Sequence, residues 1–589
     1  MYVYWNYILF YEVDIMSQQE PQLQGVAGLK KHDIKVSGIV FMLYCLVAAG
    51  AFGIEEMIPE AGPGMTLLLL CIFPFIWAYP ISSLVAECSS VMPSEGGVYV
   101  WVKEAFGEFW GFQTGWWATV STYITNGVYV ALVSGYVSQM IPMSYAGSLA
   151  LKIGMIAIFT IVNLLGLREV GTVSTVLSLL IVAAFLLVAI VGFLNWNANP
   201  VEPFMPEDYT LIDGLGGGIC ICIWMYCGYE CISNMAGEVK NPQVIPKGLK
   251  IAMPLVALTY VLPTLGGLAT LPQGSWEMWS TEGGFSGDHV GYATVLTANL
   301  GQAWGYVFLV IAIISQCAIF NTYLASGSRG FFVLADDHLC PQFLVKVSKN
   351  RGVPYVGILS LAVVTFILSF NDFTTLVSME VVFMLALYII LPISVIKLRH
   401  KLPVEERRKR GLYIIPGGNK ALIFYCGFPI VIAIIALLIN GTDYLTTGLM
   451  ALCSGPIAYI LFRKICGGLS VNDPEGNPVN GFGIPKGDTV RIGVFSLCAG
   501  VMAFFGQFWL RWYEISWGEW EPEDYDVFSN CIPQVQTGLA IGGAILIVFG
   551  LIMYFVGKKN DPPLPEHELD VEATLNKYLM EEKTETFFD

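Results

Sequence analysis

Long apolar runs separated by short polar segments dominate the chain from Val36 to Val556. Each run is about 20 residues long, the length that an α-helix needs to cross the hydrocarbon core of a bilayer. Fourteen segments fit this description: Val36–Ile54, Met65–Ala86, Trp110–Met140, Ala150–Leu167, Val173–Leu194, Leu211–Met235, Ile251–Leu271, Gly305–Leu334, Pro354–Phe370, Leu376–Ile396, Ala421–Ile439, Tyr444–Phe462, Val490–Leu510 and Thr537–Val556. The pattern predicts an all-α integral membrane protein.

Composition and charge agree with this prediction. The 589 residues are 55% hydrophobic and 13% charged, and their mean hydropathy is +0.64. Only Lys152 and Arg511 fall on one side of the predicted membrane, and the other basic residues fall on the opposite side. Because basic residues collect on the cytoplasmic side, we expect a multi-pass protein of the plasma membrane with both termini in the cytoplasm. The formal charge of -16 comes from the outer loops and the tail, and it indicates no nucleic-acid partner.

Two of the apolar segments carry a glutamate two residues after a glycine. Gly53 precedes Glu55 in the first segment, and Gly228 precedes Glu230 in the sixth. An ionisable side chain in a membrane span costs at least ~2.5 kcal/mol and usually marks a substrate or ion path. Glycine-interrupted segments at corresponding places in two halves are typical of secondary transporters, with the substrate bound between the breaks. The sequence therefore predicts a membrane transporter.

The candidate substrate site combines backbone groups and side chains of both breaks. A half-helix that starts after a break offers free N–H groups to a carboxylate, while carbonyls released at the break suit an ammonium. The predicted substrate-binding residues are Ala49, Gly50, Ala51, Phe52, Gly53, Glu55, Trp224, Cys227, Gly228 and Glu230. The predicted gating or proton-coupling residues are Trp224, Glu230 and Glu380.

For several charged residues the sequence leaves two roles open. Glu55 either lines the site or is solvated at the outer end of its span, and Glu380 either faces the pore or lies at the interface. For Glu87, near the end of the second span, we expect structural anchoring. At the cytoplasmic helix ends, Glu238 and Arg329 form either a gate salt bridge or solvated caps.

Three motifs carry a resemblance to a known family. The first is Trp224-x-x-x-Gly228-x-Glu230, followed by Gly237-Glu238-Val239-Lys240-Asn241-Pro242. The second is Pro93-x-x-Gly96-Gly97-x-Tyr99 with Ala105-Phe106-Gly107, and the third is Ser328-Arg329 with Gly352-Val353-Pro354. With these motifs the chain resembles the amino acid–polyamine–organocation superfamily of permeases from about Val36 to Phe462.

The resemblance implies a LeuT-like fold, in which five helices are repeated by five inverted helices. It places a twelve-helix core at 36–463, with repeats at about 36–194 and 211–397, after a cytoplasmic segment 1–35. Two extra spans at 489–557 follow a cytoplasmic linker 464–488, and 558–589 form a cytoplasmic tail. The family's aromatic gate over the substrate corresponds to Trp224.

Function and coupling follow from the same residues. We expect an amino acid or polyamine permease, with a cationic or zwitterionic substrate favoured by the acidic outer loops. No Lys or Arg occurs between Arg168 and Lys240, so a lysine-based proton mechanism in the fifth span is disfavoured. Two mechanisms stay open: proton coupling through Glu230 and exchange against a counter-substrate. Sodium coupling is also open, because Ser174, Thr175 and Ser178 are possible sodium ligands.

Other classes of protein are less consistent with the sequence. The five histidines fall in predicted loops or tails, and no cysteine spacing forms a metal motif, so no cofactor, metal site or enzymatic activity is expected. An amino acid-sensing receptor or scaffold of the same fold, without net transport, is an alternative. A glutamate/γ-aminobutyrate-type exchanger is another, because Gly97-Val98-Tyr99-Val100-Trp101-Val102 is similar to that branch.

Overall fold

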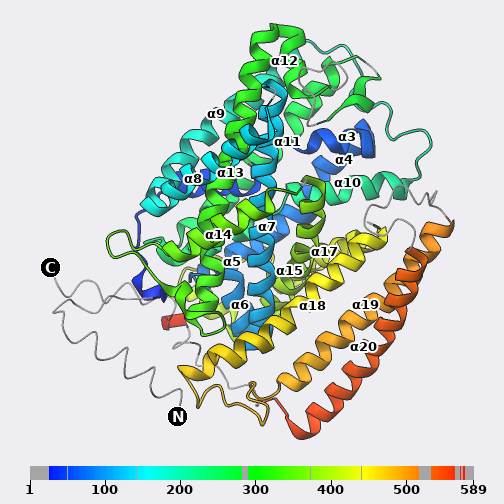
Figure 1. Ribbon diagram of the computed structural model, residues 1–589. Helices are drawn as coiled ribbons and strands as arrows, with labels where there is room; N and C mark the ends of the chain where they lie inside the picture. Colours follow the sequence, from blue (N-terminus) through cyan, green and yellow to red (C-terminus); the bar gives the residue numbers. More distant parts are fainter. Residues whose placement is uncertain are drawn as a thin grey trace.

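The computed structural model describes residues 25–563, together with residue 571 and residues 575–577. Gaps in this description fall at 49–50, 142, 273, 281–289, 372, 440 and 517–531. Within the described part, regular structure is helical, and extended pairing is limited to three isolated bridges (Figure 1). The predicted all-α class is confirmed.

The α-helices are numbered α2 to α20 along the chain. Their bounds are α2 Val36–Val47, α3 Ile54–Ala61, α4 Pro63–Phe73, α5 Tyr79–Val91, α6 Gly97–Phe106, α7 Glu108–Met140, α8 Tyr145–Leu165, α9 Leu167–Leu194, α10 Leu211–Met225, α11 Val244–Thr270, α12 Tyr292–Leu300, α13 Gln302–Asp336, α14 Tyr355–Leu368, α15 Phe373–Lys401, α16 Val404–Lys409, α17 Gly418–Ile439, α18 Gly441–Cys466, α19 Asp488–Ser516 and α20 Ile532–Asn560. Short non-α helices are η2 Gly25–Gly28, η3 Pro74–Ala78, η4 Tyr229–Glu238, η5 Ser275–Met278, η6 Gln342–Val345 and η7 Leu469–Val471.

Eleven helices in the described part are long and apolar enough to cross a membrane. One of them joins α4, η3 and α5, where Pro74 and Pro80 flank a π-helical turn. Proline produces such turns because it lacks the N–H that an α-helix uses. Three predicted spans coincide with helices outside this set: α2 and α14, which are short, and the 33-residue α7, which contains many polar side chains. The exact count of fourteen spans therefore stays a prediction.

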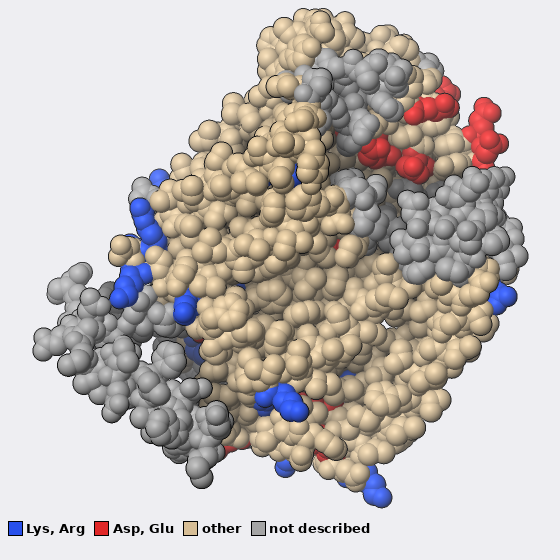
Figure 2. All heavy atoms as spheres, in the orientation of Figure 1, with Lys and Arg blue, Asp and Glu red and all other residues tan. Residues whose placement is uncertain are grey.

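Charged side chains separate along the molecule in the way that the sequence predicts. In Figure 2 most of the visible acidic surface lies at the end of the molecule near α3 and α10, and most visible basic side chains lie toward the opposite end. Exposed acids at the first end include Glu202, Glu207, Asp208 and Glu277. The acidic end corresponds to the predicted outer face.

The two C-terminal spans, α19 and α20, pack mainly on each other at the edge of the bundle (Figure 1). Glycines repeat every seven residues along both, at Gly493 and Gly500 in α19 and at Gly543 and Gly550 in α20. A Cβ atom on Gly500 would lie 2.7 Å from the Ile547 nitrogen, and one on Gly543 would lie 2.6 Å from the Phe504 nitrogen. Small residues let two membrane helices approach this closely, so the repeat defines the contact between them.

Buried charges attach this helix pair to the rest of the bundle. Glu108 at the start of α7 forms an ion pair of 2.8 Å with Arg463 in α18. The Tyr459 hydroxyl is 3.0 Å from the Glu108 carboxylate and 2.7 Å from that of Asp488, the first residue of α19. Asp488 also pairs with Arg491 at 2.5 Å. The Tyr459 hydroxyl therefore connects the start of α19 to the buried ion pair of α7 and α18.

Candidate functional site

Two helix breaks face one another in the middle of the bundle. α2 ends at Val47 and α3 begins at Ile54, while α10 ends at Met225 and η4 begins at Tyr229. Gly53 and Gly228 precede the second half of each break with φ of 97° and 96°, values that L side chains rarely adopt. A Cβ atom on Gly53 would lie 2.9 Å from the Trp224 ring, and one on Gly228 would lie 2.5 Å from the Leu46 carbonyl oxygen. Both predicted interruptions are present, and they touch.

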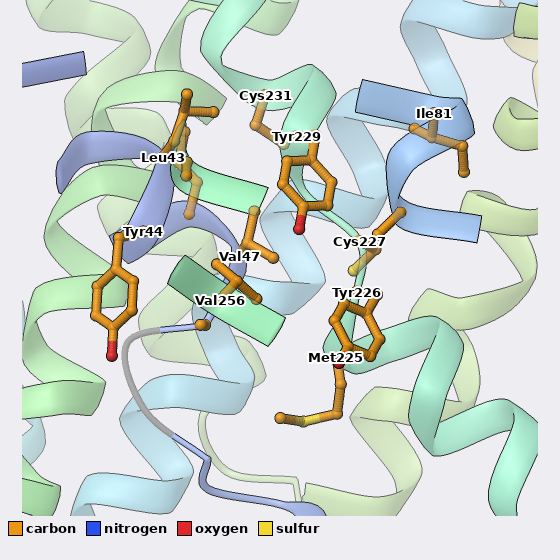
Figure 3. Close-up of a cluster of buried hydrophobic side chains, with 14 of the residues drawn as sticks. Leu43, Tyr44, Val47, Ile81, Met225, Tyr226, Cys227, Tyr229, Cys231 and Val256 are labelled. Atoms are coloured by element: carbon orange, nitrogen blue, oxygen red, sulfur yellow. The ribbon is translucent and has the colours of Figure 1, made fainter. Parts of the chain in front are cut away.

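A tyrosine that the sequence did not single out joins the two breaks. The Tyr260 hydroxyl in α11 lies 2.7 Å from the Met225 carbonyl oxygen and 3.2 Å from that of Val47. These carbonyls end α10 and α2, where the helical hydrogen bonds stop. Figure 3 shows Val47 and Met225 in the same buried cluster, with Tyr226 and Cys227 beside them. Tyr260 therefore satisfies carbonyls that the breaks release.

Glu230 is buried one residue after the start of η4, with 4% of its surface exposed. The Tyr388 hydroxyl in α15 donates to its Oε2 at 2.9 Å, and the Gly228 N–H donates to the same hydroxyl oxygen at 3.2 Å. A single tyrosine thus links the carboxylate to the break. In the described part of the chain, no Lys or Arg forms an ion pair with Glu230.

Glu380 in α15 is also fully buried and belongs to the same group of side chains. Thr125 and Trp224 lie beside its carboxylate, but neither oxygen has a hydrogen bond of good geometry within the described residues. Glu380 lies close enough to feel the charge of Glu230, and its own charge acts on Cys227. Glu380 was expected either to face the pore or to lie at the membrane interface. Its buried position near the breaks agrees with a pore-facing side chain.

Glu55 forms a third buried carboxylate, in the first turn of α3. The Tyr292 N–H donates to Oε1 at 3.3 Å, whereas Oε2 has no partner within the described residues. With 4% of its surface exposed, Glu55 is not the solvated residue of its alternative reading. The neighbouring Glu56 accepts a hydrogen bond from Ser280 at 3.0 Å.

A small closed cavity lies between the breaks. Its volume is about 10 Å³, and Val47, Phe52, Trp224, Cys227 and Tyr323 are among the residues that line it. Phe52 packs edge-on against Phe185, with ring centroids 4.9 Å apart. A cavity of this size has room for about one water molecule, so the site is closed in this conformation.

Several further predictions can be placed. Ala51 is buried next to Phe52, and the Cys227 thiol donates to the Trp224 carbonyl at 2.9 Å, whereas Ala49 and Gly50 lie outside the described residues. Glu87 has the expected anchoring position, because it pairs with Arg399 and with Arg407 at 2.6 Å each.

The predicted sodium ligands already have partners. The Ser174 hydroxyl lies 2.9 Å from that of Thr322, and the Ser178 hydroxyl donates to the Phe41 carbonyl at 3.3 Å. Thr175 donates to the carbonyl of Gly171, one turn earlier in its own helix. This arrangement does not favour a sodium site at these residues.

The end of the molecule that is predicted to be cytoplasmic contains two buried glutamates, of which the sequence indicated only one. Glu238 pairs with Arg329 at 2.5 Å, as one of its two readings anticipated. Glu95, in the connection between α5 and α6, lies next to this pair and is buried. Burial, together with the Glu238 charge, raises the pKa of the Glu95 carboxyl well above its usual range. Only the fold reveals this contact, since 143 residues of chain separate the two glutamates.

These features define a class of protein. Two facing helix breaks around a closed cavity, with buried carboxylates nearby, are typical of inverted-repeat membrane transporters. The solved structure of MhsT in complex with L-phenylalanine superposes with a TM-score of 0.52 at 11% identity, covering 70% of this chain and 99% of that chain. At this identity the likeness shows the fold alone, which is LeuT-like as predicted.

The chain belongs to the amino acid permease family, whose sequence profile matches residues 35–462. It is 29% identical over 432 residues to a probable polyamine transporter of Arabidopsis thaliana, covering 72% of this chain and 82% of the relative. A polyamine transporter of Oryza sativa subsp. japonica is 28% identical over 58% of this chain and 62% of its own. A branched-chain amino acid permease of Lactococcus lactis is 25% identical over 52% of this chain and 68% of its own. The predicted superfamily of permeases is confirmed.

Proposed function

We propose that this protein is a secondary active transporter that carries a cationic substrate, a polyamine in the first place, by alternating access. The observation that carries the proposal is the set of three buried carboxylates, Glu55, Glu230 and Glu380, around the helix breaks. Among the described residues, none of them forms an ion pair with a basic side chain. A buried charge needs a partner, and a substrate with several ammonium groups supplies one to each carboxylate.

A polyamine agrees with this arrangement better than an amino acid does. Glu55 and Glu56 occupy the first turn of α3, where the free N–H groups of a half-helix would otherwise receive a substrate carboxylate. Two acidic side chains at that place repel an incoming carboxylate. The polyamine transporters among the relatives support the same choice.

Coupling follows from the same carboxylates. When no cationic substrate is bound, a proton on Glu230 or Glu380 removes the cost of a bare charge in a buried place. A proton is therefore exchanged for the substrate across the membrane. In substrate exchange, a second substrate molecule takes the place of the proton. The hydroxyls of Ser174 and Ser178 are engaged with Thr322 and with the Phe41 carbonyl, which disfavours sodium.

Topology and domain organisation complete the proposal. Residues 36–463 form the transport core, with both termini on the cytoplasmic face of the plasma membrane. The spans at 489–557 form an extension that the charges around Asp488 hold to the core. The protein moves its substrate without converting it chemically.

Competition for uptake tests the choice of substrate. The purified protein is reconstituted in liposomes, and entry of radiolabelled putrescine is measured with unlabelled competitors. We expect spermidine and spermine to compete strongly, arginine weakly, and glutamate not at all. Inhibition by glutamate or leucine, with none from spermidine, would refute a polyamine substrate while leaving transport itself established.

A further inference from the structure

A large cavity among the described residues lies away from the helix breaks, between α19 and α20. Its volume is about 700 Å³, and all of its lining residues belong to these two helices. Its upper end is polar, with Gln507, Arg511, Gln536 and Thr537. The rest of its wall is apolar and includes Phe508 and Ile545. A cavity with one polar end and a long apolar wall has the character of an amphipathic ligand site.

The glycine repeat explains why the cavity opens where it does. Gly493 and Gly500 keep α19 close to α20, and the next position of the repeat is Gln507. On α20 the repeat passes from Gly550 and Gly543 to Gln536. Two large side chains replace the glycines, so the close backbone contact stops at this level. The space that results is part of the fold.

Gln507 gives the cavity an unused polar group. Its side chain lines the cavity and is 1% exposed, and neither its amide oxygen nor its amide nitrogen has a hydrogen-bond partner within the described residues. The Gln536 amide, in contrast, donates to the Thr442 hydroxyl at 3.0 Å. A buried amide without a partner is unfavourable, and a ligand with an ester or hydroxyl group would supply the missing hydrogen bond.

The polar end lies at the level of lipid headgroups. Trp509 and Trp512, with ring centroids 5.3 Å apart, flank Arg511 and are 41% and 50% exposed. Tryptophans of this kind mark the interface between membrane and water, and Arg511 adds a positive charge there. From Thr537 to Ile552 the cavity follows α20 for about 22 Å, at 1.5 Å per residue. This exceeds half of the ~30 Å hydrocarbon core, so one leaflet's acyl chain fits along it.

We propose that this cavity binds one glycerophospholipid of the outer leaflet. The phosphate lies at Arg511, the ester region faces the Gln507 amide, and an acyl chain lies along the apolar wall below. The charge favours a phospholipid over a sterol, because Arg511 is the one charged side chain among the described residues that line the cavity, and a sterol brings no anion. A second copy of this chain is a less suitable occupant. One of its apolar helices would have to place both an anion and a hydrogen-bonding group beside Arg511 and Gln507.

Native mass spectrometry of the full-length protein in detergent tests the proposal, with phosphatidylglycerol as the added probe. We expect the first phosphatidylglycerol molecule to bind more tightly than any further molecules. Ala544→Phe fills the cavity and should abolish this first binding step, whereas Gly542→Phe, on the same helix with no atom within 4 Å of the new Cβ, should leave it unchanged. Arg511→Gln should weaken the step about fivefold, as for one exposed ion pair, and Arg511→Lys should retain it. Glycerol phosphate, which lacks acyl chains, should not compete.

Three results would overturn the proposal. One is lipid binding that is equal in the wild type, Ala544→Phe and Arg511→Gln. Another is a sterol that binds in an Ala544-sensitive manner while phosphatidylglycerol does not. The third is a dimer that Ala544→Phe abolishes. If Ala544→Phe does not fold, the exposed Arg511 variants decide the matter, since they leave the helix contact intact.

Discussion

Replacing Glu230 by Gln is expected to abolish uptake of labelled polyamine in proteoliposomes while leaving expression and membrane insertion normal. The amide retains the shape of the carboxylate and can still accept the Tyr388 hydrogen bond, so the fold around the break is preserved. What it loses is the buried negative charge that we propose as the partner of the cationic substrate. Leaving a buried cation without its partner costs about 3–5 kcal/mol, which corresponds to a loss on the order of 100-fold or more.

Glu60→Gln is the matched control for this change. Glu60 lies in α3, the helix that follows the first break, but its side chain is exposed. We expect Glu60→Gln to transport like the wild type, and Glu230→Gln to lose both uptake and its dependence on pH. Wild-type rates and pH dependence in Glu230→Gln would remove Glu230 from the mechanism.

Replacing Gly228 by Leu is expected to weaken substrate binding strongly without preventing insertion of the protein. The backbone at Gly228 has φ of 96°, and a Cβ atom would lie 2.5 Å from the Leu46 carbonyl oxygen and 2.7 Å from the Tyr323 hydroxyl. A side chain at such a φ costs about 1–3 kcal/mol before any clash is counted. The clash separates the two breaks, so we expect at least a tenfold weaker affinity. Gly53→Leu should act in the same way through the Trp224 ring.

The measurement is a thermal shift with added spermidine, because a ligand raises the stability of the state that binds it. Gly135→Leu in α7 is the control, since no atom lies within 4 Å of the Cβ that it adds. This variant should show the wild-type shift. A normal spermidine shift in both Gly228→Leu and Gly53→Leu would place the substrate somewhere other than the helix breaks.

The sequence predicted the helix breaks because local chemistry requires them. A positive φ strongly favours glycine, and a carboxylate at membrane depth is too costly without a role, so Gly53, Gly228 and Glu230 stand out in a single chain. The exact helix ends were less predictable: the first span was expected to continue to Ile54, but α2 already ends at Val47. A hydropathy pattern does not record where the backbone hydrogen bonds stop.

Contacts between distant segments were not predictable in the same way. Tyr260 and Tyr388 look like ordinary aromatic residues of apolar spans, and only the packing of α11 and α15 brings their hydroxyls to the breaks. The orientation of Glu380 likewise depends on how α15 rotates against its neighbours. The heptad glycines of α19 and α20 were visible in the sequence, but their meaning depends on the two helices being partners.

Counterflow is the most direct test of the central claim, that the protein carries a cationic substrate through the site at the helix breaks. Proteoliposomes are loaded with unlabelled spermidine, diluted into a trace of labelled spermidine, and followed for transient accumulation of label. We expect accumulation with the wild-type protein and none with Glu230→Gln. Specific binding of spermidine by the wild type without any counterflow would instead identify a receptor of this fold, and would contradict the account.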